Sequence, residues 1–164
     1  AALPPPAPPA TAEALAPAVG QRLEERWEQS RAFGVEAGET VLHAGDLMAF
    51  LPLEPFADNF GLHPEEVHPY VSSTAAEGSG DPLDLFATPS IPVALIGTSY
   101  SADPLWSFHP LLQAAVEAEV LPVAEVGRGP FAPMEAYLSS DTIVETPPVV
   151  VVWEIPERYL TVDP

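Results

Sequence analysis

Residues 91–101 (Ile-Pro-Val-Ala-Leu-Ile-Gly-Thr-Ser-Tyr-Ser) join an apolar run to an abrupt stop at Gly97. A short apolar run bounded by a turn residue is typical of a strand buried on both faces. A helix-like segment follows directly, as in the repeating unit of a parallel sheet. The segment therefore predicts an open α/β fold with Ser99 at the carboxyl edge of the sheet, where such folds place their chemistry.

Ser99 has two interpretations on this segment alone. Glycine permits a tight turn, and free N–H groups at the start of a helix can stabilise an oxyanion, so Ser99 stands where a nucleophile would. Serine is also a favoured helix N-cap, and in that case Ser99 only begins the next helix. Other parts of the chain have to distinguish between the two.

The chain beyond residue 91 alternates between strand and helix patterns. Apolar spacing predicts a helix over residues 104–120, and a second helix is expected over 132–139. Further strands are expected over 121–126 and 149–153, with a loop at 127–130 between the first of them and the second helix. Because residues 149–153 are entirely apolar, they predict the centre of a parallel sheet covered on both faces.

The first half of the chain has a weaker pattern. Residues 1–10 are rich in proline and predict an extended lead-in, so a single α/β domain is expected over 11–164. Thr11 is expected to cap a helix that runs to about Phe33. A short strand is expected within residues 40–53, and a long irregular segment with one short helix near Pro64–His68 within residues 54–90.

Charge and cysteine content exclude several classes of function. The chain has 24 acidic residues against five arginines and no lysine, which gives a net charge of −19. Nucleic acid is excluded as a partner and an anionic membrane surface is disfavoured, because both require clustered cations. The absence of cysteine excludes disulfides and thiolate metal sites. No apolar run reaches the ~20 residues of a membrane span, and the first residues lack a signal-peptide pattern.

No metal or cofactor is expected. His63 and His68, with Glu65, Glu66 and Asp58, form the only grouping that invites a metal interpretation. The pair lacks the spacing of two histidines one helical turn apart that zinc enzymes use, so a solvated segment is favoured. His109 is expected to be a helix-surface or packing residue, because it lies too far along the helix from Ser99 to act as its base.

Polar residues gather where the three expected strands end. Arg128 lies between two glycines after the second strand, and Glu154 and Arg158 follow the third. In so acidic a chain, Arg128 predicts a site for an anionic oxygen of a substrate or intermediate. The alternative for Arg128 is an ion pair with Glu125 or Glu154. For Arg158 a structural role is favoured.

Four segments carry a family resemblance: GTSYS, WSFHPLLQAA, GRGPF and VVWEIPERYL. In their order and spacing, residues 91–160 resemble the SGNH-hydrolase-like alginate O-acetyltransferases of the AlgX/AlgJ type, and the earlier residues do so more loosely. The resemblance implies an SGNH-like parallel sheet flanked by helices. It also implies a periplasmic enzyme that transfers acetyl groups to exopolysaccharide hydroxyls.

The resemblance assigns roles to four residues. Ser99 is the nucleophile that carries the acetyl group, and Arg128 matches the family's arginine near the active site. Tyr100 and Glu154 are pocket-lining or supporting residues. The implied partners are a polysaccharide substrate, an acetyl donor that is a protein or a small molecule, and a membrane-associated biosynthesis complex.

One departure from the family keeps other functions open. The family's Asp-x-His pair precedes the serine, but the corresponding place here is occupied by Leu3–Pro9, which contains neither residue. Because a serine hydroxyl is a weak nucleophile without a base, the alternatives are a non-catalytic polysaccharide-binding domain or a structural partner in a secretion complex. A chain with this net charge does not attract an anionic polymer at long range. The charge therefore favours a neutral glycan as the ligand, or a locally basic cleft around Arg128 that binds the polymer.

Overall fold

The computed structural model describes residues 10–27, 31–45, 56, 59, 61, 63–74 and 91–160. Its centre is a three-stranded parallel sheet in the order β6-β5-β7, formed by β5 (Val93–Ile96), β6 (Val120–Pro122) and β7 (Val150–Trp153). Val93 pairs with Val120 on one side and with Val150 on the other. The expected parallel α/β sheet is therefore confirmed.

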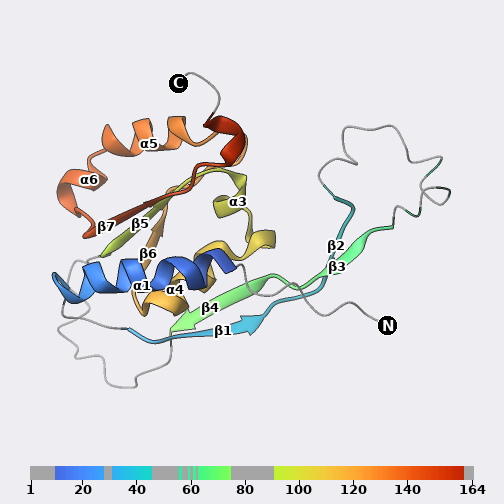
Figure 1. The fold of residues 1–164 in the computed structure, drawn as a ribbon, viewed down its shortest axis with the longest axis horizontal. Coiled ribbons are helices and arrows are strands. Elements are labelled where there is room, and N and C mark those ends of the chain that lie inside the picture. The colour runs from blue at the N-terminus through green and yellow to red at the C-terminus, as the bar shows by residue number, and fades with distance from the viewer. Residues whose placement is uncertain are drawn as a thin grey trace.

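Helices cover both faces of this sheet (Figure 1). Helices α1 (Ala10–Glu24) and α4 (Phe108–Val116) pack on the face that holds Val93 and Leu95. On the opposite face, α5 (Phe131–Leu138) and α6 (Thr142–Glu145) pack against Ala94 and Ile96. Because side chains alternate between the faces of a strand, the four residues of β5 supply both halves of the core, and all four are fully buried.

The segment expected to form one helix over 104–120 contains a 3-10 turn, a shorter helix and the first residue of β6, so that prediction was wrong in its bounds. Helix α3 (Ser99–Ala102) begins before it, a 3-10 turn η4 (Pro104–Trp106) follows, and then α4. The Asp103 carboxylate accepts a hydrogen bond from the Leu105 N–H at 2.9 Å, and Ser107 has a φ of 55°. Such local side-chain bonds compete with a continuous helix, and the left-handed residue changes its direction.

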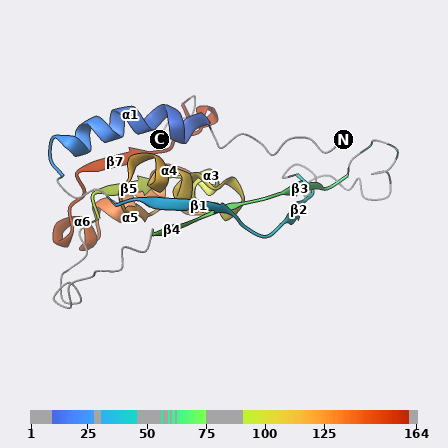
Figure 2. The same ribbon diagram turned by 90° about the horizontal axis from the view of Figure 1, so that it is seen from below.

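An antiparallel ribbon projects from the body of the molecule (Figure 2). It pairs β1 (Phe33–Ala37) with β4 (Tyr70–Thr74) and β2 (Val41–His43) with β3 (Glu65–Val67). The short helix expected near Pro64–His68 is therefore wrong, because that segment forms β3. The helix expected to run from Thr11 to Phe33 begins at Ala10 and ends at Glu24, so Thr11 lies inside it and Phe33 begins β1.

Two further expectations have definite outcomes. Residues 149–153 were expected at the centre of the sheet, but β7 lies at the edge of the described sheet, where Val151 is 44% and Trp153 40% exposed. The strand expected within 40–53 is confirmed as β2, and residues 46–53 lie outside the described residues. Within the part of the chain that is described, no helix is long and apolar enough to span a bilayer.

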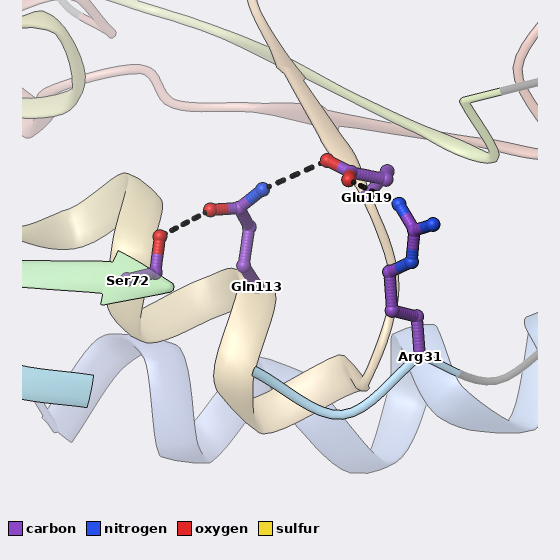
Figure 3. Close-up of polar contacts among 4 residues, drawn as sticks. All are labelled: Arg31, Ser72, Gln113 and Glu119. Atoms are coloured by element: carbon purple, nitrogen blue, oxygen red, sulfur yellow. Dashed lines mark hydrogen bonds and ion pairs between the residues drawn. The ribbon is translucent and has the colours of Figure 1, made fainter. Parts of the chain in front are cut away.

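Four polar side chains fasten the ribbon to the body (Figure 3). The Ser72 hydroxyl of β4 donates to the Gln113 amide oxygen of α4 at 2.6 Å, and the Gln113 amide nitrogen donates to Glu119 at 3.2 Å. The Glu119 carboxylate in turn lies 3.1 Å from the Arg31 guanidinium, just before β1. The chain of contacts therefore links both strands of the ribbon to α4 and to the segment that leads into β6.

Candidate functional site

Ser99 is the first residue of α3 and follows β5 directly after Gly97 and Thr98. The N-cap of α3 is Thr98, whose hydroxyl accepts from the Tyr100 N–H at 3.4 Å, so the alternative that Ser99 is the cap is wrong. Ser99 is half-buried, and none of the described residues hydrogen-bonds its hydroxyl. Helix α3 has only four residues, so its dipole contributes little at this position.

Glu154 holds the turn that presents Ser99. Its Oε2 accepts from the Thr98 N–H at 2.7 Å and from the Thr98 hydroxyl at 2.9 Å, and the Ser101 hydroxyl lies 3.3 Å away. The Glu154 N–H donates to the Ile96 carbonyl at 2.8 Å, which fixes the end of β7 against the end of β5. A Cβ atom on Gly97 would lie 2.6 Å from Glu154 Oε2, so only glycine leaves room for this contact.

Tyr100 belongs to an aromatic cluster. Its ring lies 5.7 Å from the Trp106 ring, and the Arg158 guanidinium lies 5.5 Å from the Tyr100 ring centre. The same guanidinium lies 5.0 Å from the Tyr159 ring. Hydrogen bonds to the hydroxyls of Tyr100 and Tyr159 raise the pKa of Arg158, which therefore stays charged at every physiological pH.

A cavity of about 260 Å³ opens beside Ser99's neighbours. It is lined by residues of α1, α3, η4, α4 and the end of β7, namely Thr11, Tyr100, Ser101, Trp106, Phe108 and Glu154. A second cavity of about 400 Å³ shares Ser101 and Phe108 as walls and extends toward β4 and β6. Two of the predicted site residues, Tyr100 and Glu154, thus line one cavity next to Ser99.

Arg128 lies apart from that cavity wall. Its guanidinium is 3.7 Å from the Glu125 carboxylate, and the two side chains are 57% and 43% exposed. In the structure, Arg128 therefore forms the ion pair with Glu125 that the sequence offered as the alternative to an anion site. A pair this exposed stabilises the fold little. Its loop is shaped by Gly127 and Gly129, both with positive φ, and a Cβ on Gly129 would lie 3.5 Å from the Tyr159 ring.

Three of the described histidines, His43, His68 and His109, have contacts away from Ser99. His109 lies 2.8 Å from the Val120 carbonyl, which confirms its packing role, and His68 lies 3.1 Å from the Thr40 hydroxyl. The His43 ring contacts the Trp106 ring edge-on at 5.9 Å. The metal grouping considered above also includes His63 and Asp58, and of these two only Asp58 lies outside the described residues.

Sequence reasoning missed Trp106 and underestimated Arg158. Trp106 belongs to one of the segments that carry the family resemblance, but nothing in its spacing indicates that it would meet Tyr100 and His43. Arg158 lies 58 positions from Tyr100, and only the shared sheet edge could have suggested that they meet. The arrangement combines an unbonded serine hydroxyl, a rigid turn and an aromatic cavity, which suits acyl transfer to or from a bound ring compound.

Comparison with known proteins shows which family the chain resembles. The family model described as "SGNH hydrolase-like domain, acetyltransferase AlgX" matches residues 7–157. A protein of Pseudomonas putida named probable alginate O-acetylase AlgJ is 45% identical over 150 residues, which cover 91% of this chain and 38% of that protein. Its namesake in Pseudomonas aeruginosa is 37% identical over 93% of this chain and 41% of its own length.

Solved structures agree with the sequence comparison. The O-acetyltransferase domain of Pseudomonas putida AlgJ superposes with a TM-score of 0.73 at 38% identity, covering 94% of this chain and 51% of that one. Pseudomonas aeruginosa AlgX superposes with a TM-score of 0.63 at 20% identity, covering 90% of this chain and 33% of that one, which supports the fold alone. The chain spans about two fifths of the length of the curated relatives reported above.

Proposed function

The chain belongs to the family of SGNH hydrolase-like domains of the acetyltransferase AlgX, and on that premise we propose that it serves in the O-acetylation of alginate, with Ser99 as the residue that carries the acetyl group. The relatives named alginate O-acetylase support the substrate and the transferred group. The proposed location is the periplasm. The proposed partners are the polysaccharide, an acetyl donor and a membrane-associated biosynthesis complex.

The observation that carries this proposal is the setting of Ser99. Its hydroxyl has no hydrogen-bond partner among the described residues, whereas Thr98 and Ser101 on either side are both held by Glu154. A serine that served only to cap or pack would use its hydroxyl as its neighbours do. The rigid turn thus leaves one hydroxyl of three uncommitted, beside a cavity that two of its neighbours line.

The proposed reaction has two transfers. The Ser99 oxygen attacks the carbonyl carbon of the donor's acetyl group, a new C–O bond forms, and the bond from that carbon to the donor breaks. The hydroxyl proton passes by way of a general base to the leaving group. A sugar hydroxyl then attacks the acetyl-serine and gives its proton to the base. The Ser99 oxygen leaves and regains a proton.

This chemistry requires a general base, and the lack of a partner for the Ser99 hydroxyl favours a second function. None of the described residues bonds the Ser99 hydroxyl, so the structure assigns no base to it. A protein without such a base would bind polysaccharide in the same cavity and transfer nothing. The two functions differ in one measurable product, the acetylated serine.

The deciding experiment is mass spectrometry of the intact protein after incubation with a small acetyl ester. The enzyme should gain one acetyl group on the peptide that contains Ser99, and Ser99→Ala should abolish this gain and slow ester turnover by about 10⁴-fold or more. Ser139→Ala is the matched control, because this exposed serine lies at the far end of α5. Equal turnover by the wild type and by Ser99→Ala would remove Ser99 from the mechanism.

A further inference from the structure

Tyr100 and Trp106 line the smaller cavity, and Arg158 contacts Tyr100; we call these three side chains the aromatic–arginine surface. Tyr100 is 41% and Trp106 36% exposed, although large aromatic side chains are usually well buried. The two rings lie 5.7 Å apart, and the Arg158 guanidinium lies 5.5 Å from the Tyr100 ring. The three residues come from α3, η4 and the turn after β7.

Each member of this surface is held in place by a further contact. The His43 ring of β2 packs edge-on against Trp106 at 5.9 Å, and the Arg158 guanidinium lies between the Tyr100 and Tyr159 rings. The Arg158 Nη1 also donates to the Tyr100 hydroxyl at 3.5 Å. The rings and the charge are therefore preorganised, which lowers the entropy cost of binding.

The chemistry of this surface fits a sugar acid. Exposed aromatic faces take up the apolar C–H face of a pyranose ring, and their negative quadrupole favours the weakly positive hydrogens of that face. A guanidinium beside the ring matches a carboxylate, which it binds through two parallel hydrogen bonds. A neutral sugar would use the rings alone, so the arginine specifies the acid.

We propose that the aromatic–arginine surface is a subsite for one hexuronate residue of the polysaccharide, stacked on Tyr100 and Trp106 with its carboxylate on Arg158. This inference rests on the proposed function and specifies how that substrate is held. The adjoining cavity of about 260 Å³ lies just below the ~300 Å³ at which sites for drug-sized ligands begin, so it suits a single ring. Tyr100 lines this cavity together with Ser101 and Glu154, which hold the turn that presents Ser99, so the bound ring lies beside that turn.

The net charge of −19 does not oppose this arrangement. Long-range repulsion slows the approach of an anionic polymer and weakens as salt is added, whereas a short contact with a guanidinium is screened much less. The acidic group in the cavity wall is Glu154, whose oxygens accept hydrogen bonds from Thr98 and Ser101. Recognition at the subsite is therefore a short-range effect, and it requires a residue at the position of Arg158 that carries a positive charge.

The test compares two probes in the Ser99→Ala background, where binding is measured by calorimetry without turnover. One probe is a short alginate oligosaccharide, and the other is the same oligosaccharide with its carboxyl groups reduced to alcohols. We expect the acid form to bind about tenfold more tightly or better, and Arg158→Gln to reduce this preference to less than about threefold. Arg158→Lys should be intermediate, because it keeps the charge but loses the planar, two-bond geometry.

Two further variants separate stacking from charge. Trp106→Ala should weaken both probes by a similar factor, because stacking on an aromatic face does not depend on the carboxylate. Arg22→Gln is the matched control for Arg158→Gln, because it removes the same charge from an exposed arginine near the end of α1, and it should change neither affinity. Thermal melts of all variants verify that each is folded.

The outcomes distinguish this inference from the proposed function. Equal affinity for the acid and the reduced probe, or an acid preference that survives Arg158→Gln, would overturn the subsite while leaving acetyl transfer by Ser99 intact. An acid preference that depends on Arg158 in a protein that never acetylates Ser99 would support the subsite and overturn the enzyme. Arg22→Gln matching Arg158→Gln would also overturn the subsite, because the effect would then come from net charge alone.

Discussion

At the scale of single residues, the position of Ser99 depends on one glycine and one glutamate from different strands. Thr98 is only 3% exposed, so its N–H and its hydroxyl both need a partner, and Glu154 supplies both. Gly97 leaves the space in which the carboxylate sits. Glu154 therefore acts on Ser99 through Thr98, and we infer that it is a positioning residue.

Gly97→Ala tests this dependence. The added Cβ would lie 2.6 Å from Glu154 Oε2 and 2.9 Å from its Cβ, so the carboxylate has to move away from Thr98. We expect the free energy of unfolding to fall by about 1–3 kcal/mol, as for other overpacked sites, and acetyl transfer to fall with it. Urea denaturation measures the first quantity.

Gly20→Ala provides the matched control. Nothing lies within 4 Å of a Cβ at Gly20, which is inside α1, and alanine is the better helix former there. This variant should gain about 0.5–1 kcal/mol. If the two alanine substitutions change the free energy of unfolding in the same direction, the contact between Gly97 and Glu154 does not constrain the turn.

Sequence could predict Ser99 and Glu154 but not the residues around them. Each lies within three residues of the end of a short apolar strand, and the ends of parallel strands meet at one edge, so their proximity follows from a local pattern. The contacts of Trp106 depend on a left-handed residue at Ser107 and on a β2 strand that brings His43 alongside, neither of which leaves a periodic signal. The contacts of Arg158 with two tyrosines likewise exist only in the folded chain.

At the scale of elements, the ribbon is attached to the α/β body mainly through α4 and β4. The Ser72–Gln113–Glu119–Arg31 contacts lie at this junction (Figure 3). Gln113 is 5% exposed and bonds in both directions, whereas the Arg31 side chain is 62% exposed. The buried Gln113 amide, and not the exposed ion pair of Arg31, should therefore contribute most of the energy that holds the ribbon to the body.

Gln113→Leu should accordingly lower the free energy of unfolding more than Arg31→Gln does. Leucine at position 113 leaves the part-buried Ser72 hydroxyl without its acceptor, and we expect a loss of about 1–3 kcal/mol in the free energy of unfolding. Arg31→Gln should cost less than about 1 kcal/mol, because its ion pair is solvent-exposed. Chemical denaturation of both variants provides the comparison, and a larger loss for Arg31→Gln would contradict the assignment.

The ribbon also shows why the first half of the chain was harder to predict than the second. Strand β5 is recognisable because its own four residues are buried on both faces. Strands β1 and β4 are half-exposed, and they pair residues as far apart as Phe33 and Thr74, so their stability comes from distant partners. Tertiary pairing of this kind overrides local propensity, and it converted a predicted helix near Pro64–His68 into β3.

At the scale of the whole molecule, the dominant property is the charge of −19 on 164 residues. Only five cations oppose 24 acidic groups, and the ion pairs of Arg22, Arg31 and Arg128 seen within the described residues are solvent-exposed, so each contributes little. Compacting the chain brings the remaining acidic groups closer together than in the unfolded state. Self-repulsion of this kind destabilises the folded state at low ionic strength.

Stability should therefore rise as salt is added in the range where screening is the main effect. The Debye length falls from about 30 Å at 0.01 M to about 8 Å at 0.15 M, so most repulsion across the molecule is removed over that interval. We expect the melting temperature to increase between these concentrations and to do so equally in NaCl and KCl. A difference between the two salts would indicate binding of a particular cation. A melting temperature that does not change would mean that the acidic groups lie too far apart in the folded protein to repel one another, and charge repulsion would then not limit its stability.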